Sequence, residues 1–245
     1  MNAGEALRAA HSLPVSTLAE RLGEGGLVVV APHPDDESLA CGALIAEACA
    51  GGRPTRVAIV SDGSGSHPAS KKYPRLRLRA VREAEARRAV AALGLPPRHA
   101  VFLRLRDRFV CGEGPSANAA VAAIEACARR VGAEALFVSW RHDPHCDHQA
   151  CYRLARAAQR RLPGVALYEY SVWGAALAPA APVDSPAGGF RFAVGGHRAR
   201  KRRAIAAHRS QTTAMIDDDP RGFRLSAADL ARFDGPYESF FEAAA

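Results

Sequence analysis

Residues 26–37 read GLVVVAPHPDDE, and this stretch decides the fold class. Its first six residues form a short, continuous apolar run rich in β-branched side chains, which is typical of a buried strand in a parallel sheet. A helix is expected to follow from about Asp36 to Cys49, and the pair Gly51-Gly52 ends it. The stretch therefore opens a strand–helix unit.

The same alternation continues as far as residue 173. Further strands are expected at 55–61, 101–105, 135–140 and 165–173, and further helices at 76–93, 118–131 and 147–162. Strands that alternate with helices of this length predict right-handed βαβ units. We therefore expect a Rossmann-like α/β fold, a doubly wound and mainly parallel sheet with helices on both faces. Ligands in such sheets bind outside the carboxyl ends of the strands.

The two ends of the chain depart from this pattern. Residues 1–25 are expected to form an N-terminal helical extension. Residues 174–245 are expected to be irregular, apart from a short strand at 190–194 and a basic helix at 197–208. Because no internal repeat or second domain is evident, residues 1–245 are predicted to form a single domain.

The composition is that of an ordinary globular protein, with 48% hydrophobic and 24% charged residues. No apolar run approaches the roughly 18 residues of a membrane span, and the N-terminus lacks the apolar stretch of a signal peptide. The six cysteines form no CxxC pair, which favours free thiols over disulfides. We expect a cytoplasmic protein without a transmembrane segment; the sequence leaves its oligomeric state open.

The net charge of +8 is concentrated in two basic segments. Twelve Lys or Arg residues lie between Lys71 and Arg108 against three acids, and six lie between Arg198 and Arg209 with none. These segments are either solvated helix faces or the lining of a site for an anionic substrate. Few aromatic residues are interleaved with the arginines, so we expect no nucleic-acid partner.

The first chemical cluster, HPDDE, follows the first strand. Its acids could simply stabilise a helix N-terminus through capping and the helix dipole. That interpretation explains neither His33 nor two aspartates followed by Glu37. One imidazole and a carboxylate three residues later could instead supply two metal ligands, which would leave a neighbouring carboxylate free as a base.

The second cluster, HDPHCDH at 142–148, follows the fourth strand. His145 and His148 are three residues apart, so both can face one side of a helix's first turn. Together the two clusters offer two imidazoles and a carboxylate. This donor set suits a catalytic zinc with three protein ligands and an open position for water.

These residues carry a family resemblance. HPDDE at 33–37 together with HCDH at 145–148 resembles the PIG-L or LmbE-like family of zinc-dependent N-acetylglucosaminyl deacetylases. One departure is Cys146, where the family usually has proline, and this leaves the geometry of the turn open. Weaker similarities extend over most of the chain: Ser61-Asp62-Gly63, Arg82 with Glu85, Tyr168-Glu169-Tyr170 with Trp173, and Lys201 with His208-Arg209-Ser210-Gln211.

The resemblance implies a role for each residue of the two clusters. His33, Asp36 and His148 become the ligands of one zinc per chain, or of another divalent metal, and Asp35 becomes the general base. His145 would polarise the oxyanion or act as the acid, oriented by Asp147. Asp35 or His145 would protonate the departing amine, and the sequence does not choose between them.

Two substrate contacts are predicted. The resemblance places Arg82 at the pocket edge, where its planar fork suits sugar hydroxyls or phosphates; otherwise it is an exposed helix arginine paired with Glu83 or Glu85. Asp107, just after the third strand, is either a ligand of a sugar hydroxyl or an ordinary loop aspartate.

The expected function is hydrolysis of the N-acetyl group of an N-acetylglucosamine-type sugar or its conjugate. A zinc amidase that cleaves a larger cysteinyl or fatty-acyl amide is the nearest alternative, because the zinc chemistry would be the same. A nucleic-acid-binding or scaffolding module is the third. The natural sugar and its aglycone stay open.

Overall fold

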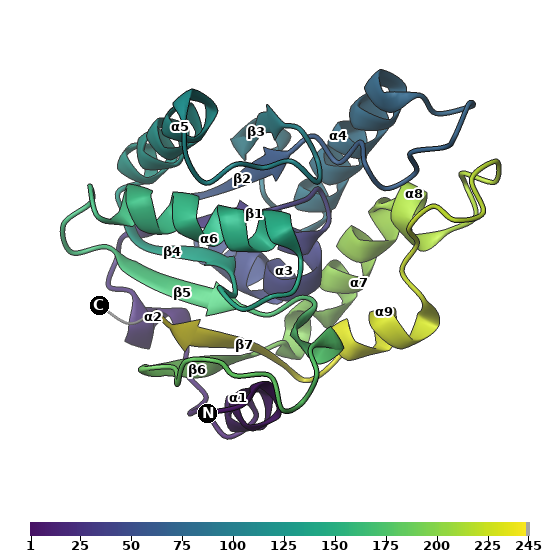
Figure 1. The fold of residues 1–245 in the computed structure, drawn as a ribbon. Coiled ribbons are helices and arrows are strands. Elements are labelled where there is room, and N and C mark those ends of the chain that lie inside the picture. Colours follow the sequence, from purple (N-terminus) through teal and green to yellow (C-terminus); the bar gives the residue numbers. More distant parts are fainter. Residues whose placement is uncertain (244–245) are drawn as a thin grey trace.

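A computed structural model describes residues 1–243 of this protein. The helices and strands alternate through the first two thirds of the chain (Figure 1). In chain order they are α1 (Ala3–Ala10), α2 (Leu18–Arg21), β1 (Gly26–Ala31), α3 (Asp36–Ala50), β2 (Thr55–Ser61), α4 (Arg75–Ala92), η1 (Pro97–His99), β3 (Ala100–Leu105), α5 (Pro115–Val131), β4 (Ala133–Ser139), α6 (Cys146–Gln159), β5 (Ala166–Tyr170), η2 (Gly174–Ala176), β6 (Gly188–Ala193), η3 (Gly195–His197), α7 (Arg198–Ala207), α8 (Arg209–Thr212), α9 (Ala227–Phe233) and β7 (Tyr237–Glu242).

Seven strands form one sheet in the order β3-β2-β1-β4-β5-β7-β6. The strands β3, β2, β1, β4 and β5 are parallel to one another, and β7 runs antiparallel between β5 and β6. In the centre, Val29 of β1 lies opposite Val57 of β2 and Phe137 of β4. The predicted single α/β domain with a mainly parallel, Rossmann-like sheet is confirmed.

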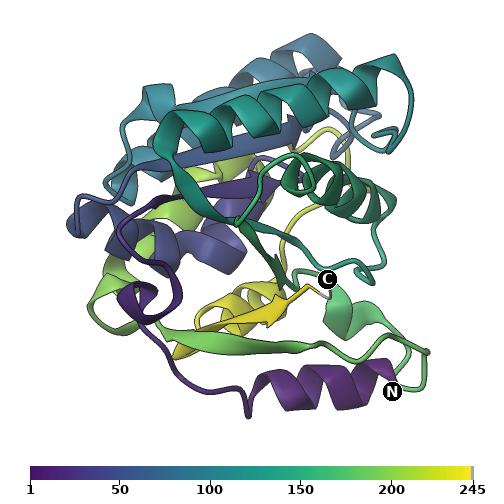
Figure 2. The same cartoon turned by 90° about the vertical axis from the view of Figure 1, so that its left-hand side faces the viewer.

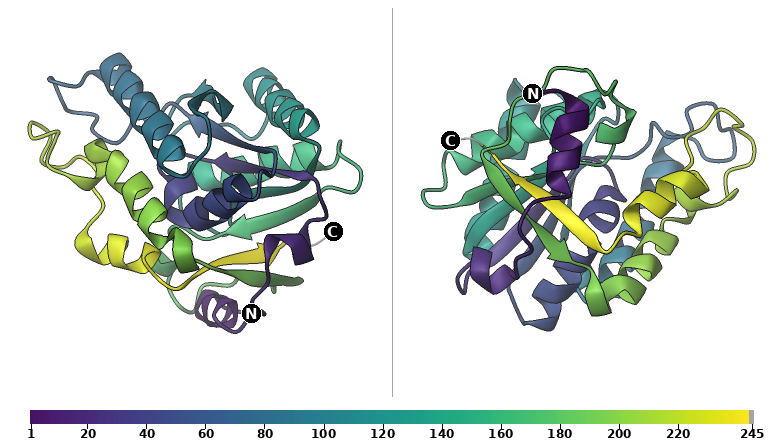
Figure 3. Two further views of the ribbon diagram at one scale, coloured as in Figure 1. Left: turned by 180° about the vertical axis from the view of Figure 1, so that it is seen from behind. Right: turned by 90° about the horizontal axis from the view of Figure 1, so that it is seen from below.

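Both faces of the sheet are covered by helices, which is why β1 consists of apolar residues without alternation. Its side chains alternate between two separate cores. Val29 packs in the core formed with α3, α4 and α7, and Val28 packs in the core formed with α5 and α6. Seen from behind, α3, α4 and α7 lie in front of the sheet (Figure 3).

The arrangement of β1 and β4 determines where residues from the two sequence clusters meet. The two strands are neighbours at the sheet's centre, but the helix that follows β1 covers one face and the helix that follows β4 covers the other. Such a reversal opens a crevice at the carboxyl ends of the two strands. Residues that follow β1 and β4 therefore meet, although more than a hundred positions separate them.

The C-terminal third is more regular than expected. The segment 174–245 contains β7 as well as the expected short strand and basic helix, and the strand β7 was not predicted. Phe240 and Phe241 of β7 are buried, and β7 pairs with both β5 and β6. The strand β5 in turn ends at Tyr170 rather than at Trp173, because the amides of Val172 and Trp173 donate to Asp143.

The N-terminal helical extension consists of α1 and α2. The helix α1 lies along the edge formed by β6 and β7 (Figure 2), and Asn2 forms an isolated bridge with Pro182. In the part of the chain that the structure describes, no helix combines the length and apolar character needed to cross a membrane. All six cysteines are free thiols, and Cys41, Cys127 and Cys151 are buried.

Candidate metal centre

Three donor atoms from the two sequence clusters form a compact triangle. Nδ1 of His33 lies 3.2 Å from Nε2 of His148, and Oδ2 of Asp36 lies 3.4 Å from each of these nitrogens. In a tetrahedral site with bonds of 2.0–2.1 Å, neighbouring ligand atoms are about 3.3 Å apart. The triangle therefore has the dimensions of one face of a tetrahedral metal site.

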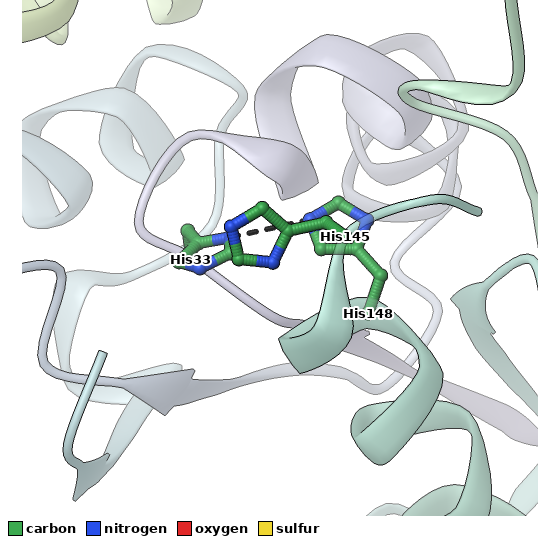
Figure 4. Close-up of side chains that lie close together, drawn as sticks. All are labelled: His33, His145 and His148. Atoms are coloured by element: carbon green, nitrogen blue, oxygen red, sulfur yellow. Dashed lines mark hydrogen bonds between the residues drawn. The ribbon is translucent and has the colours of Figure 1, made fainter. Parts of the chain in front are cut away.

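A third imidazole stands beside this triangle. The rings of His33, His145 and His148 converge from the turn after β1 and from the start of α6 (Figure 4), each with a nitrogen within 4.8 Å of the others. His145 is the least buried of the three, and its Nδ1 accepts a hydrogen bond from the backbone amide of Asp147 at 3.2 Å. Because Nδ1 accepts this hydrogen bond, the ring proton lies on Nε2, and neither nitrogen of His145 is free to bind a metal. This favours Asp36 over His145 as the third ligand.

Each imidazole of the triangle has a carboxylate at its other ring nitrogen. Nε2 of His33 lies 3.2 Å from Asp147 and 3.4 Å from Asp107, and Nδ1 of His148 lies 3.4 Å from Oδ1 of Asp143. Metal-bound histidines almost always have such a partner, which fixes the tautomer and makes the ligand more basic. The sequence motif contains Asp143, but its position alone did not indicate this role.

The residues of the site fit a divalent cation electrostatically. Burial lowers the pKa of His148, but Asp36 and Asp143 outweigh that effect and raise it to about 9. Burial raises the pKa of Asp36, whereas His148 and His33 lower it well below its usual range. A pocket whose carboxylates hold a buried imidazole in its charged form is also one that attracts a metal cation, which competes for the same nitrogens.

Asp35 faces the pocket without joining the triangle. Its carboxylate accepts a hydrogen bond from Nη2 of Arg82 at 3.0 Å, and within residues 1–243 its side chain makes no capping hydrogen bond to α3. Capping therefore does not account for this acid. Burial raises the pKa of Asp35 to about 6, although Arg82 opposes that shift. The backbone of Asp35 has a φ of 154°, a conformation that side-chain-bearing residues rarely adopt.

Glu37, the last acid of HPDDE, is a structural residue. It is fully buried; Oε2 accepts from the amide of Asp35 at 3.0 Å, and Oε1 lies 3.0 Å from Nε2 of His208. This contact ties the turn after β1 to the end of α7, 171 positions away. His208 is accordingly part of the support of the site.

His145 is held as a neutral hydrogen-bond donor. Because Nδ1 accepts the amide of Asp147, the ring proton lies on Nε2. Burial, followed by the neighbouring His33 and His148, lowers the pKa of His145 to about 4. The expected orientation of His145 by Asp147 thus takes another form: the backbone amide contacts His145, whereas the carboxylate contacts His33 and the amides of residues 108 and 110.

The two predicted substrate residues line the pocket but are committed to protein partners. Arg82 is buried and donates to the carbonyls of Gly63 and Pro34 as well as to Asp35, so it is neither an exposed helix arginine nor an open fork at the pocket edge. Asp107 accepts the amide of Gly65 at 2.8 Å and lies beside His33. Both side chains contact residues of the first cluster: Arg82 contacts Asp35, and Asp107 lies beside His33.

The pocket above the triangle has a volume of about 500 Å³. Its polar floor is formed by the residues described above, and its apolar wall includes Trp173 and Phe223, whose rings meet edge to face with centroids 5.7 Å apart. Cys146 also lines it, and the helix α6 still begins at this residue with His145 as its N-cap. With Cys146 in place of the family's usual proline, the helix α6 still begins regularly.

Six of the eighteen basic residues in the two segments have acidic partners among the described residues, including Arg82 with Asp35. In the first segment, Lys72 pairs with Asp217, Arg75 with Asp62 and Arg104 with Glu83. In the second, the buried Lys201 pairs with Glu238 and the exposed Arg202 pairs with Asp234. Of all these basic residues, only Arg82 and Arg108 line the pocket in the described part of the chain.

A comparison with protein families identifies the scaffold. The PIG-L profile, described as GlcNAc-PI de-N-acetylase, matches residues 28–159. The chain belongs to the PIG-L family. The matched region covers more than half of the chain and includes both clusters. Among curated protein sequences, none matches this chain significantly.

Several solved structures share the fold. N,N'-diacetylchitobiose deacetylase from Pyrococcus horikoshii superposes with a TM-score of 0.69 at 17% identity, covering 98% of this chain and 90% of that one. The zinc-inhibited form of teicoplanin deacetylase Orf2 gives 0.62 at 19% identity, covering 88% and 97%. GalB, a 4-carboxy-2-hydroxymuconate hydratase from Pseudomonas putida KT2440, gives 0.63 at 17%, covering 90% and 96%. Since the fold also carries a hydratase, the reaction has to be argued from the site.

Proposed function

We propose that this protein is a zinc-dependent hydrolase that removes the N-acetyl group from an N-acetylglucosamine-type sugar or its conjugate. One observation carries the proposal. Three donor atoms have the spacing of a metal site, and a carboxylate outside that triangle, Asp35, is held beside it by a buried arginine. The membership of the PIG-L family and the deacetylases among the structural neighbours support the choice of substrate.

In this proposal His33, Asp36 and His148 hold the zinc. A bound zinc lowers the pKa of a water molecule from 15.7 towards about 7 and polarises the amide carbonyl. The protein's contribution is to fix the three ligand atoms before the metal arrives. Asp143 and Asp147 do this from behind the imidazoles, at 3.4 Å from His148 and 3.2 Å from His33.

Asp35 is the general base. Burial raises the pKa of its carboxylate above the usual range, which favours acceptance of a proton from the attacking water. Arg82 keeps its carboxylate turned towards the pocket through the 3.0 Å contact. Its neighbour Asp36, whose pKa lies far below the usual range, would be a much weaker base.

His145 stabilises the oxyanion by donating a hydrogen bond from its Nε2–H group. Removing a donor of this kind typically costs about 10²–10³ in rate. Because its Nδ1 accepts a backbone amide, His145 carries no second proton for the leaving amine at neutral pH. We therefore infer that Asp35, rather than His145, returns the proton to the leaving amine.

A zinc amidase for larger acyl groups is the second candidate. The observation in its favour is the apolar wall of the pocket, where Trp173 and Phe223 could cover an acyl chain as well as the apolar face of a sugar. The two candidates share every residue of the metal centre. They differ in the size of the acyl group that the pocket accepts.

The test measures metal content and acyl release together. Purified protein should contain about one zinc per chain and release acetate from neutral N-acetylglucosaminides, and it should act much more slowly on N-octanoyl analogues. Stripping the metal should abolish activity, and zinc should restore it. His142→Ala is the matched control, because His142 belongs to the same motif but pairs with Asp184 outside the pocket. Metal-free protein with full activity would contradict the proposal, and a preference for octanoyl substrates would favour the second candidate.

A further inference from the structure

Arg108 stands out among the arginines around the pocket because its charge is uncommitted. It is exposed and lines the cavity, and its guanidinium has no acidic or hydrogen-bond partner among residues 1–243. Arg75 pairs with Asp62, Arg82 with Asp35 and Arg104 with Glu83, whereas Arg106 stacks on Phe109 and does not line the pocket. Arg108 is therefore the free cation of this pocket in the described chain.

The metal centre itself fixes where Arg108 is placed. Its backbone amide donates to Oδ2 of Asp147 at 2.7 Å, and the same carboxylate oxygen lies 3.2 Å from Nε2 of His33. Its φ of 68° lies in the left-handed region that favours glycine. An arginine that adopts this conformation at a pocket wall is held there by its surroundings, which is common at functional sites.

The other ionisable residues of the pocket lining are mainly acidic, in contrast to Arg108. Its ionisable lining consists of Asp35, Asp36 and Asp107 with the engaged Arg82 and the imidazoles, so an anion near the floor would meet carboxylates. The reacting acetamide must lie at this floor, close to Asp35. Because Arg108 is the exposed cation of the lining, an anionic group elsewhere on the substrate would be attracted to it rather than to the carboxylates.

We propose that Arg108 binds an anionic group, a phosphate or carboxylate, on the aglycone of the amino sugar. This inference rests on the proposed function and narrows its substrate class to anionic glycosides. A guanidinium suits such groups because its planar fork donates two parallel hydrogen bonds to two oxygens. Within the basic segment 71–108 this one residue would serve the anionic substrate, since Arg82, the other basic residue that lines the pocket, is paired with Asp35.

The test compares three substrates: methyl N-acetylglucosaminide, N-acetylglucosamine 1-phosphate and the N-acetylglucosaminide of glycolic acid. The wild-type enzyme should favour the charged substrates by about tenfold or more in kcat/KM at low salt, and the preference should fall as salt is added. Arg108→Asn should bring the ratio close to one. Asparagine tolerates the left-handed conformation, so the substitution keeps the backbone. Arg108→Lys should retain part of the preference.

Arg106→Asn is the matched control. Arg106 is exposed on the same loop but stacks on Phe109 and does not line the pocket, so the ratio should stay at the wild-type value. A wild-type ratio near one, or a ratio that Arg108→Asn leaves unchanged, would overturn the inference and leave the deacetylase proposal intact. The phosphate and carboxylate substrates show which anion is preferred.

If none of these substrates is hydrolysed, a measurement of their binding affinities tests the inference instead. Calorimetric titration with N-acetylglucosamine 1-phosphate should then show tighter binding than with the methyl glycoside for the wild-type protein, and equal binding for Arg108→Asn. Equal affinities in the wild-type protein would overturn the inference. Lack of hydrolysis with intact, Arg108-dependent binding would contradict only the proposed reaction.

Discussion

Asp35 and Asp36 are adjacent in the sequence, yet they have different partners and pKa values. Asp36 lies 3.4 Å from two imidazoles and is strongly acidic, whereas Asp35 contacts Arg82 and has its pKa raised to about 6. The difference in pKa arises from the surroundings: at Asp36 the two imidazoles outweigh the effect of burial, whereas at Asp35 burial outweighs the effect of Arg82. A ligand and a base can thus occupy consecutive positions.

This separation predicts opposite phenotypes for two similar substitutions. Asp35→Asn should keep its zinc and lose activity by about 10²–10⁴, since it removes only the base. Asp36→Asn should lose most of its zinc, because it removes one of three ligands. Metal analysis and acetate release on the same samples provide the check. Zinc loss in Asp35→Asn with full occupancy in Asp36→Asn would reverse our assignment.

Asp143 provides a second test at this scale. Its Oδ1 lies 3.4 Å from Nδ1 of His148, on the side of the ring away from the triangle, and its Oδ2 accepts hydrogen bonds from the amides of residues 172 and 173. Asp143→Asn should weaken zinc binding by about 10–100-fold, measured by competition with a chelator. Asp184→Asn, an exposed carboxylate beside His142, serves as the control. Equal zinc affinities would show that Asp143 only shapes the loop.

At the scale of elements, the strand β7 depends on a buried ion pair. Lys201 of α7 donates to Glu238 of β7 at 2.7 Å, and both side chains are buried. Glu238 also accepts the amides of Ala43 and Leu44 in α3 at 2.8 and 2.9 Å. One carboxylate therefore joins the strand β7 to two helices on the same face of the sheet.

Glu238→Gln should destabilise the protein by about 3–5 kcal/mol, because it leaves the ammonium of Lys201 buried without its counter-charge. Chemical denaturation measures the change in the free energy of unfolding. Glu242→Gln on the same strand is exposed and should change it little. If both variants are equally stable, the ion pair contributes nothing to the packing of β7. Replacing Lys201 by Met in the Glu238→Gln background should recover part of the loss.

At the scale of the whole molecule, the metal centre links the two faces of the sheet. His33 and Asp36 belong to the turn and helix on one face, and His148 belongs to α6 on the other. A ligand that binds only the folded state stabilises it by about 2.7 kcal/mol at a concentration 100 times its Kd. Zinc bound by these three residues would therefore raise the global stability of the fold.

Adding zinc at that excess to the metal-free protein should raise its Tm by about 5–10 °C, given 2–4 °C per kcal/mol for a chain of this size. Differential scanning calorimetry measures this shift. His148→Ala should lose most of the response, whereas His142→Ala should retain it. A zinc-dependent shift of the same size in His148→Ala would place the metal elsewhere.

The sequence by itself determined the alternation of strands and helices, the mainly parallel sheet and the two clusters at its carboxyl edge. These features are encoded locally: a run of apolar residues, a glycine stop and the spacing of histidines within one helical turn act over a few positions. The order of strands then brings HPDDE and HCDH together, because both follow neighbouring parallel strands.

Only the tertiary structure decided which carboxylate serves which imidazole. Asp143 lies beside His148, whereas Asp147 and Asp107 lie beside His33. Arg82 donates a hydrogen bond to Asp35 and is not an open substrate contact at the pocket edge. The strand β7 is likewise formed by pairing with strands that lie far away in the chain. Such contacts depend on how distant segments pack, and no short pattern of residues records that geometry.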